Sequence, residues 1–389
     1  MEKVRIMHLI GDLTKGGAER FVVDLCNELA KVDKYEVFLI SICANDEENT
    51  FVNDIHETVR YVSFNKERGF SLGVLITLTK WLIKSNPNVL HSHLNGFEYL
   101  AFYLFLNKGT LFFHTIHNIA VAECPNLFIK NFRKIWYKSN KVKPVTISYD
   151  GSKTFRDYYK LENDILIENG REDLTTSDEF PLLIKKYKEA HDYYILVHVG
   201  RIAIEKNQEL LIRAVQKFNT TEKKKCKLII IGEVREKPLF QHLLKVVNDD
   251  AYIAFVGGKN NIADYLSIAD AFCLSSIFEG MPISLIEALS LGCIPVCTPV
   301  GGIKQMVMHG KTGFLSKDIS VDRYCEVLIE ALNHPDKMMI KRNGRLFFES
   351  NYHIQASANA HAKNYLLSSC GVGQLNGRLS SDYIKIKLN

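Results

Sequence analysis

The first half of the chain alternates short apolar runs with amphipathic segments. Residues 4–10 and 36–42 are runs of β-branched and aliphatic side chains, and the segment between them repeats its apolar residues at helical spacing. The runs are apolar without alternation, which is typical of strands that are buried on both faces of a parallel sheet. The pattern therefore predicts β–α–β units and an α/β fold.

The same pattern begins again in the second half. Residues 171–192 carry many charges and few strand formers, and a new strand and helix series follows them as far as residue 300. We predict two doubly wound, Rossmann-like domains that face each other across a cleft. Their expected bounds are 1–175 and 190–350; a helix at about 352–370 is expected to pack back on the first domain, and 371–389 is expected to be a loose tail.

Composition excludes several classes of protein. Hydrophobic residues make up 47% of the chain and charged residues 24%, so it is not disordered, collagen-like or a coiled coil. The net charge of +5, without an RNP or KH pattern, does not indicate a nucleic-acid partner. Nine cysteines without a CxxC spacing, no signal peptide and no spanning segment predict a cytoplasmic protein.

Two cations follow the first strand of the second domain. That strand ends at Gly200, and Arg201 and Lys206 lie in the loop before a helix that is expected to begin near Asn207. In open α/β sheets ligands bind beyond the carboxyl ends of strands, and an arginine fork with a lysine suits a diphosphate. The alternative is a solvated turn with a Glu205 and Lys206 pair.

Two glutamates lie seven residues apart near a later strand end. Glu279 is in the loop, and Glu287 is in the helix whose first turn is marked by Pro282. Carboxylates there can accept hydrogen bonds from sugar hydroxyls, and the amides of the first turn, from Met281, Ile283 and Ser284, can hold an anion. The alternative is that Glu287 only complements the helix dipole and Glu279 is a loop charge.

A glycine pair, Gly16 and Gly17, precedes the first helix. Small residues there let backbone amides approach a ligand, although a plain strand-to-helix turn is the alternative. The segment does not fit GxGxxG, and no acidic residue ends the second strand convincingly before Asp46, so a nicotinamide-dependent dehydrogenase is disfavoured.

Histidines cluster at two further strand ends. Alternation places His91 and His93 on one face of their strand, and His114 and His117 on opposite faces of the next one. A four-ligand metal cluster is then awkward, and we predict no metal site. His117, at the strand exit, is best placed to meet a substrate, whereas His114 is expected to be a core residue.

Residues 124–149 are basic and aromatic. They hold six basic residues and no acidic one. This composition favours contact with an anionic membrane surface, although a solvated helix face and RNA binding are alternatives. The residues expected to make the contact are Lys130, Arg133, Lys134 and Lys138.

Taken together, these segments resemble family 4 glycosyltransferases, the retaining, nucleotide-sugar-dependent enzymes of the GT-B fold that build bacterial surface polysaccharides. The resemblance spans nearly the whole chain, and its motifs stand in the family's order. They are GGAE at 16–19, the HSH and IHN strand ends, ENG at 168–170, GR and KN at 201–207, E-x7-E at 279–287, PVGG at 299–302 and KTGFL at 311–315.

The resemblance assigns roles to these residues. Arg201 and Lys206 would bind the donor diphosphate, Glu287 the ribose, and Glu279 the transferred sugar. His117 would touch the sugar or the developing charge, and the PVGG amides would close the donor pocket. The remaining residues expected at the donor, phosphates or acceptor are Gly16, Gly17, Gly280, Met281, Pro282 and Ile283. The donor expected is a UDP-sugar, and the absence of a DxD triplet suggests that no metal is required.

The sequence departs from the family at two places. Asn169 and Gly170 are followed by Arg171 instead of leading to the usual aspartate, and Lys304-Gln305 replaces the Pro-Glu that often follows the second GG. The expected activity is transfer of a hexose or N-acetylhexosamine to a glycan acceptor, expected to be lipid-linked, at the inner face of the cytoplasmic membrane. A nucleotide-sugar epimerase and a non-catalytic partner of another transferase are the alternatives.

Overall fold

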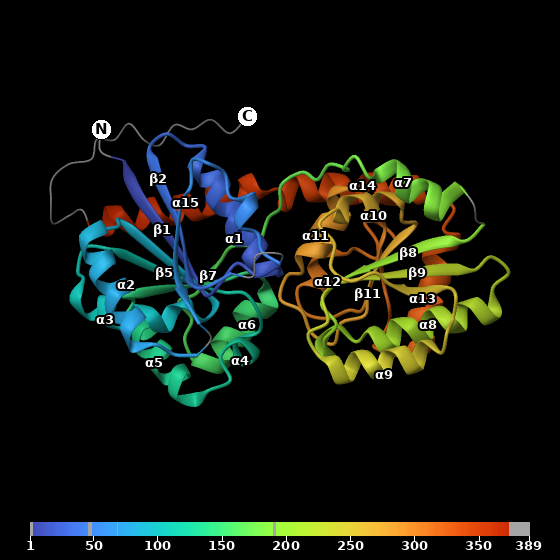
Figure 1. Cartoon of the computed structure of the whole chain (residues 1–389), viewed down its shortest axis with the longest axis horizontal. Helices are drawn as coiled ribbons and strands as arrows, with labels where there is room; N and C mark the ends of the chain where they lie inside the picture. The colour runs from blue at the N-terminus through green and yellow to red at the C-terminus, as the bar shows by residue number, and fades with distance from the viewer. Residues whose placement is uncertain (1–2, 46–48, 68, 190–191, 373–389) are drawn as a thin grey trace.

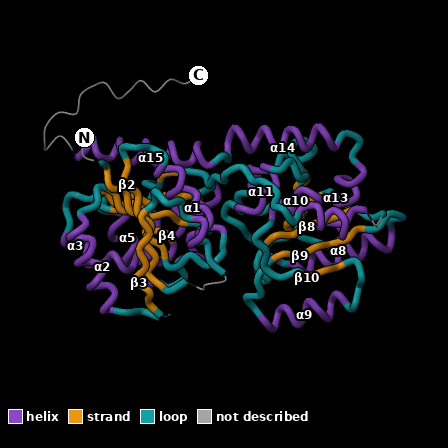
Figure 2. Tube along the Cα trace, turned by 45° about the horizontal axis from the view of Figure 1, so that its top comes forward, coloured by secondary structure: helices purple, strands orange, loops and turns teal. Residues whose placement is uncertain are grey.

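Two parallel sheets, each flanked by helices, lie side by side in the computed structural model (Figures 1 and 2). The structure describes residues 3–45, 49–67, 69–189 and 192–372. Most of the predicted tail, 373–389, lies outside these residues, and residues 371–372 belong to the last helix. Every strand pair in both sheets is parallel, which confirms the predicted pair of doubly wound sheets.

The first sheet has seven strands in the order β3-β2-β1-β4-β5-β6-β7. Its strands are β1 Val4–Ile10, β2 Tyr35–Cys43, β3 Arg60–Lys66, β4 Val89–His93, β5 Leu111–Ile116, β6 Val142–Thr146 and β7 Ile165–Leu166. The accompanying helices are α1 Gly17–Ala30, α2 Leu72–Ser85, α3 Ala101–Leu106, α4 Ala120–Glu123, α5 Leu127–Lys138 and α6 Tyr149–Tyr159, with 3-10 turns at Val52–Asp54 and Leu94–Leu100.

The second sheet has six strands in the order β10-β9-β8-β11-β12-β13. Its strands are β8 Tyr194–Val199, β9 Cys226–Ile231, β10 Ile253–Phe255, β11 Ala271–Leu274, β12 Pro295–Cys297 and β13 Phe314–Leu315. The helices are α7 Phe180–Ile184, α8 Gln208–Thr221, α9 Lys237–Val247, α10 Ile262–Ile268, α11 Ile283–Ser290, α12 Ile303–Met306, α13 Val321–Asn333, α14 Lys337–Asn351 and α15 Ile354–Val372, with a π turn at Lys185–Glu189 and a 3-10 turn at Ile204–Lys206.

Local sequence explains where several helices begin. The Asn126 side chain accepts hydrogen bonds from the amides of Phe128 and Ile129 and so begins α5, the basic helix.

The polar interval after residue 171 is not a bare linker, because α7 forms in it. The Ser177 hydroxyl and amide both bond to the Asp264 carboxylate, which attaches this segment to α10.

The chain crosses between the two sheets twice, once at the segment that contains Arg171 and once at the segment from Tyr352 to Ile354. These two crossing segments lie against each other. The amide of Arg171 donates to the carbonyl of Tyr352 at 2.9 Å, and the amide of Ile354 donates to the carbonyl of Arg171 at 2.9 Å. A side chain on Gly170 would come within 2.7 Å of the Ile354 Cα, so glycine permits this approach. After the second crossing, α15 runs back along the first sheet, where the Tyr365 hydroxyl lies 2.7 Å from His91 Nδ1 (Figure 1).

The apolar core is continuous across the boundary between the sheets. One buried cluster runs from β1 through α1 to α11 and the strands of the second sheet. A second cluster fills the space under α2, α3 and α5. No helix among the residues described is long and apolar enough to cross a membrane.

Candidate active site

A lysine and a glutamate pair at the strand ends of the second sheet. Lys206 ends the 3-10 turn after β8, and Glu279 lies in the loop after β11. The Lys206 Nζ lies 2.5 Å from Glu279 Oε1, and the Ser276 hydroxyl donates to the same oxygen at 2.7 Å. Glu279 is only 9% exposed. Two donors therefore fix this carboxylate, and Oε2 is the oxygen left for a ligand.

Arg201 lies at the same strand end as Lys206. Its carbonyl accepts a hydrogen bond from the Gln208 amide at 2.8 Å, which attaches the loop to the start of α8. The guanidinium forms no ion pair with any residue that the structure describes. The predicted pair of cations is thus brought to one strand end, with Lys206 engaged by Glu279 and Arg201 available to an anion.

The loop that carries Glu279 lies directly against the first domain. A side chain on Gly280 would come within 2.7 Å of the His117 carbonyl, so glycine lets the two strand ends meet. Gly301, at φ +50°, turns the PVGG segment beneath this loop. The Gly302 amide donates to the Gly280 carbonyl at 3.1 Å. This amide therefore stabilises the loop, and closure of the donor pocket by the PVGG amides stays a prediction.

The glycine pair faces the start of α11. Pro282 is the residue before the helix, so α11 begins one residue later than the sequence suggested. A side chain on Gly17 would approach Ile283 at 3.4 Å, in ordinary contact across the boundary. Met281 is buried, and its carbonyl accepts a hydrogen bond from the Asn169 side chain. The GGAE, ENG and E-x7-E motifs, far apart in sequence, thus lie together.

Glu287 is held by a residue that sequence reasoning noted only as a departure. Arg171 Nε donates to Glu287 Oε1 at 3.0 Å, and its Nη1 donates to Asp24 Oδ2 at 2.7 Å. Burial lowers the pKa of Arg171, but Asp24 and Glu287 outweigh burial and raise it. Arg20 also pairs with Asp24. A buried chain of alternating charges therefore joins α1, the first crossing and α11.

Glu19, the last residue of GGAE, has an unusual environment. Its carboxylate folds over Gly16, where a side chain would meet Oε2 at 2.3 Å. Burial raises the pKa of Glu19 to about 7, against the lowering effect of Arg201. The sequence could not show this, because the cations near Glu19 belong to the other domain.

The predicted histidines divide as expected between the two faces of the sheet. His114 lies 2.9 Å from the Ser92 hydroxyl and 3.3 Å from Arg133 Nη1, so it is a buried, partnered residue. His117 lies on the other face, where its Nε2 is 3.0 Å from His93 Nδ1. His8 of β1, which the sequence analysis did not single out, continues this row, with Nδ1 3.0 Å from His93 Nε2.

The basic helix α5 contains one residue that was wrongly assigned to a membrane surface. Arg133 is 3% exposed, and it pairs with Glu98 at 2.7 Å and Glu123 at 3.5 Å. Its side chain points inward because those carboxylates lie beneath the helix. Lys130 lies over the Tyr158 ring at 4.1 Å, and Lys138 is exposed.

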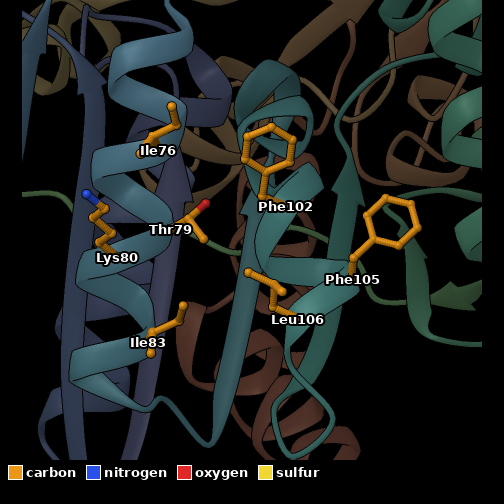
Figure 3. A pocket seen from close by; sticks show the side chains of 7 residues that line it. All are labelled: Ile76, Thr79, Lys80, Ile83, Phe102, Phe105 and Leu106. Atoms are coloured by element: carbon orange, nitrogen blue, oxygen red, sulfur yellow. The ribbon is translucent and has the colours of Figure 1, made fainter.

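An apolar groove lies beside α5, between α2 and α3. Its volume is about 360 Å³, and Figure 3 shows Ile76 and Ile83 of α2 near Phe102 and Leu106 of α3. Phe105, 70% exposed, stacks edge-on against Trp136 of α5 and extends the apolar surface toward that helix. The full lining is Ile76, Thr79, Lys80, Ile83, Phe102, Phe105 and Leu106. Sequence analysis missed it because α2 and α3 are separate in the chain.

Two doubly wound domains whose facing strand ends gather cations, carboxylates and a histidine define an enzyme of the GT-B fold. Residues 15–153 match the model of Glycosyltransferase Family 4, and residues 179–347 match that of Glycosyl transferases group 1. The chain belongs to the family 4 glycosyltransferases, so the epimerase and the non-catalytic partner are not supported.

Named relatives agree with this membership. The capsular polysaccharide biosynthesis glycosyltransferase CapH of Staphylococcus aureus is 24% identical over 76% of this chain and 82% of its own. An N-acetylgalactosamine-N,N'-diacetylbacillosaminyl-diphospho-undecaprenol 4-alpha-N-acetylgalactosaminyltransferase of Campylobacter jejuni is 34% identical over 32% of this chain and 33% of its own. The structure of Anabaena HepE in complex with UDP and glucose superposes with a TM-score of 0.79 at 17% identity, covering 94% of this chain and 100% of HepE. The likeness to HepE shows the fold.

Proposed function

We propose that this glycosyltransferase transfers a hexose or N-acetylhexosamine, with retention, from a nucleotide diphosphate sugar, with UDP-sugars favoured. The acceptor is a lipid-linked glycan in polysaccharide or glycoconjugate biosynthesis. The observation that carries the proposal is the Lys206 and Glu279 pair beside Arg201, opposite His117. The relatives that make capsular polysaccharide and extend a diphospho-undecaprenol glycan support the choice of acceptor.

The proposed chemistry rests on stabilising the departing diphosphate. Arg201 contacts the phosphates as a planar fork, and Lys206 adds a point charge. These preorganised cations favour the charge that develops as the bond to the sugar breaks. Because these cations can stabilise that charge, we propose that transfer does not require a metal ion. Glu279, fixed through Oε1 by Lys206 and Ser276, uses Oε2 to accept bonds from sugar hydroxyls.

The donor site is tested by thermal unfolding with UDP, GDP, ADP and NAD. A ligand at about 100 times its Kd adds about 2.7 kcal/mol of stability, so UDP should raise the Tm and Arg201→Ala should abolish the rise. Arg213→Ala is the matched control, because Arg213 lies on α8 of the same domain, is 50% exposed and pairs with Glu209. Equal stabilisation by all four ligands, or a rise that survives Arg201→Ala, contradicts the assigned site.

Retention is tested separately by following transfer with proton NMR. The anomeric coupling of the first product formed should match that of the donor. A product of the opposite configuration would refute the retaining mechanism while leaving the donor site intact.

We also propose that the first domain rests on an anionic membrane. The face formed by α2, α3 and α5 exposes Ile83, Phe105 and Phe128, which are 52%, 70% and 83% accessible. None of the three helices contains an acidic residue, and Lys80 lines the groove. Apolar side chains surrounded by lysines suit insertion at a negatively charged lipid surface. This location places the enzyme at the surface where a lipid-linked acceptor is held.

A further inference from the structure

Two buried polar side chains, His198 and Gln208, lie directly behind the loop that carries Arg201. His198 is in β8 and is fully buried, and Gln208 is the first residue of α8 and is 1% exposed. Gln208 Nε2 lies 2.8 Å from the Arg201 carbonyl and 3.3 Å from His198 Nε2. His198 Nδ1 lies 2.9 Å from the carbonyl of Cys273 in β11. A continuous chain of hydrogen bonds therefore runs from the backbone of β11 to the loop.

The two ends of this chain determine where each proton lies. Both ends are backbone carbonyls, and a carbonyl only accepts hydrogen bonds. His198 is neutral, because burial lowers its pKa to about 4, so the imidazole carries one proton. The Cys273 carbonyl requires that proton on Nδ1, which leaves Nε2 as an acceptor. The Gln208 amide group then donates one hydrogen to His198 and the other to the Arg201 carbonyl.

The reverse arrangement fails at both ends of the chain. With the proton on His198 Nε2, the lone pair of Nδ1 would face the Cys273 carbonyl. The Gln208 amide would also have to turn its oxygen toward the Arg201 carbonyl. Two acceptors would then face each other at each end of a buried site, and such a mismatch is costly. One arrangement alone satisfies all three bonds.

The chain fixes the peptide group that follows Arg201. Gln208 binds the carbonyl of this peptide, and its N–H, which belongs to Ile202, donates to the carbonyl of Glu233 at 2.8 Å. The peptide plane is thus held on both sides. The Arg201 guanidinium has no ion pair within the described part of the chain, so its place at the strand end depends on this backbone.

Lys206, at the other end of the loop, is also held by buried polar groups. The Ser275 hydroxyl lies 3.0 Å from the carbonyl of Lys206 and 2.9 Å from that of Asn207. A side chain on Gly200 would come within 3.2 Å of His198 Nε2 and 3.6 Å of the Lys206 side chain, so the lysine stem passes close to this histidine. Both cations of the loop therefore rest on the same buried polar layer.

We propose that His198 and Gln208 are positioning residues that hold Arg201 in its binding position before the donor diphosphate arrives. Both side chains are buried, so they act through the loop and not by contact with the ligand. A loop that is already held in its binding conformation loses less conformational entropy when the ligand binds. The direction of the hydrogen bonds stands on the geometry of the chain, whereas the effect on the donor rests on the proposed function.

The competing interpretation is that Gln208 only stabilises the second domain. A second glutamine on α8, Gln216, provides the comparison, because its side-chain amide donates to the carbonyls of Val246 and Val247 at 3.0 and 3.4 Å. Methionine has a similar size and shape to glutamine but no N–H group. Gln208→Met and Gln216→Met therefore each remove two hydrogen bonds to backbone or core, but only the first removes a bond to the loop.

The hydrogen-bond chain is tested by nitrogen-15 NMR of histidine-labelled full-length protein, with the His198 signals assigned by their loss in His198→Phe. We expect Nδ1 to be protonated and Nε2 unprotonated. In Gln208→Met, the Nε2 signal should move to that of a nitrogen that accepts no hydrogen bond, while Nδ1 stays protonated. Gln216→Met should leave both signals unchanged. A protonated Nε2 in the wild type, or an Nε2 signal that Gln208→Met does not move, overturns the proposal.

The binding arm compares the Kd of UDP with that of uridine, by ligand-detected NMR. Gln208→Met should weaken UDP by about tenfold, the value of one aligned hydrogen bond, and leave uridine unchanged, because uridine has no phosphate for Arg201 to contact. Gln216→Met should change neither Kd. An equal loss for both ligands in Gln208→Met, or an unchanged Kd of UDP, overturns the positioning role. If the wild type binds neither ligand, the proposed function fails and the donor role fails with it, while the His198 signals still decide the hydrogen-bond chain.

Discussion

Individual side chains at the strand ends are fixed by partners from distant parts of the chain. Glu279 is a clear case, because it lies in a loop and yet is buried and neutralises Lys206. Removing one member of a buried pair leaves an uncompensated charge. The site and the stability of the second domain therefore depend on the same residues.

This dependence predicts different outcomes for two substitutions of Glu279. Glu279→Gln keeps the bond from Ser276 and should lower transfer by about a hundredfold with a small loss of stability. Glu279→Ala should also lower the free energy of unfolding by about 2–4 kcal/mol, because Lys206 loses its partner. Initial rates and urea unfolding measure the two effects. Wild-type transfer by Glu279→Gln would refute the assignment of Glu279 to the sugar.

Glu19 predicts a pH-dependent stability. Its pKa rises from 4.5 to about 7 on folding, so its contribution is fully present below about pH 4.5 and is lost as pH rises through 7. Glu19→Gln, which stays neutral, should therefore gain stability relative to wild type between pH 5 and 8. Because the side chain is partly exposed, we expect a gain of about 1–2 kcal/mol. Urea unfolding at pH 5 and at pH 8 checks this prediction, and Glu57→Gln, at an exposed glutamate, is the control. Parallel profiles of stability against pH for Glu19→Gln and wild type would contradict the prediction.

At the scale of elements, the periodic pattern of apolar residues predicted the strands well, but it did not predict which side chains and grooves lie on the surface. Continuous apolar runs predicted the strands, and with them the strand ends at which the candidate residues lie. The inward turn of Arg133 and the groove between α2 and α3 were not predictable in this way. Both depend on which helices lie side by side, and local sequence does not encode that.

The α2, α3 and α5 face predicts a measurable membrane affinity. Phe102→Ser with Phe105→Ser should weaken binding to phosphatidylglycerol vesicles by about tenfold or more, since burying each ring contributes about 1.5–3 kcal/mol. Lys134→Ser with Lys138→Ser should weaken binding mainly at low salt. Vesicle co-sedimentation measures both. Met338→Ser is the control, because Met338 is 74% exposed on α14 of the other domain. Unchanged binding in the phenylalanine variant would remove the membrane proposal.

At the scale of the whole molecule, Arg171 joins the two domains. Its two bonds reach Asp24 of the first domain and Glu287 of the second. The sequence showed that this position departs from the family, but only the structure shows a partner on each side. The positions of Arg201, Lys206, Glu279 and His117 could be predicted because they follow strands, whereas the role of Arg171 could not, because it depends on tertiary neighbours.

Arg171→Met should destabilise the protein by about 3–5 kcal/mol, because two buried carboxylates lose their shared cation. A double-mutant cycle with Glu287→Gln should show strong coupling, since the second substitution removes one of those charges. Arg345→Met, at a 35% exposed arginine that pairs with Asp173 and Glu349, should cost less than about 1 kcal/mol. Equal losses for the two arginines would refute the bridging role.

The paired crossings also determine how the domains can move. Arg171 is bonded to Tyr352 and Ile354 across the two strands, so the crossings form one short ribbon instead of two independent linkers. A ribbon of this kind permits rotation about a single axis and resists sliding. Rotation separates groups far from the axis more than groups near it. Opening the molecule should therefore part the contact between Gly280 and His117, while the charge chain beside the axis stays closed. The two domains would then stay in register as they open.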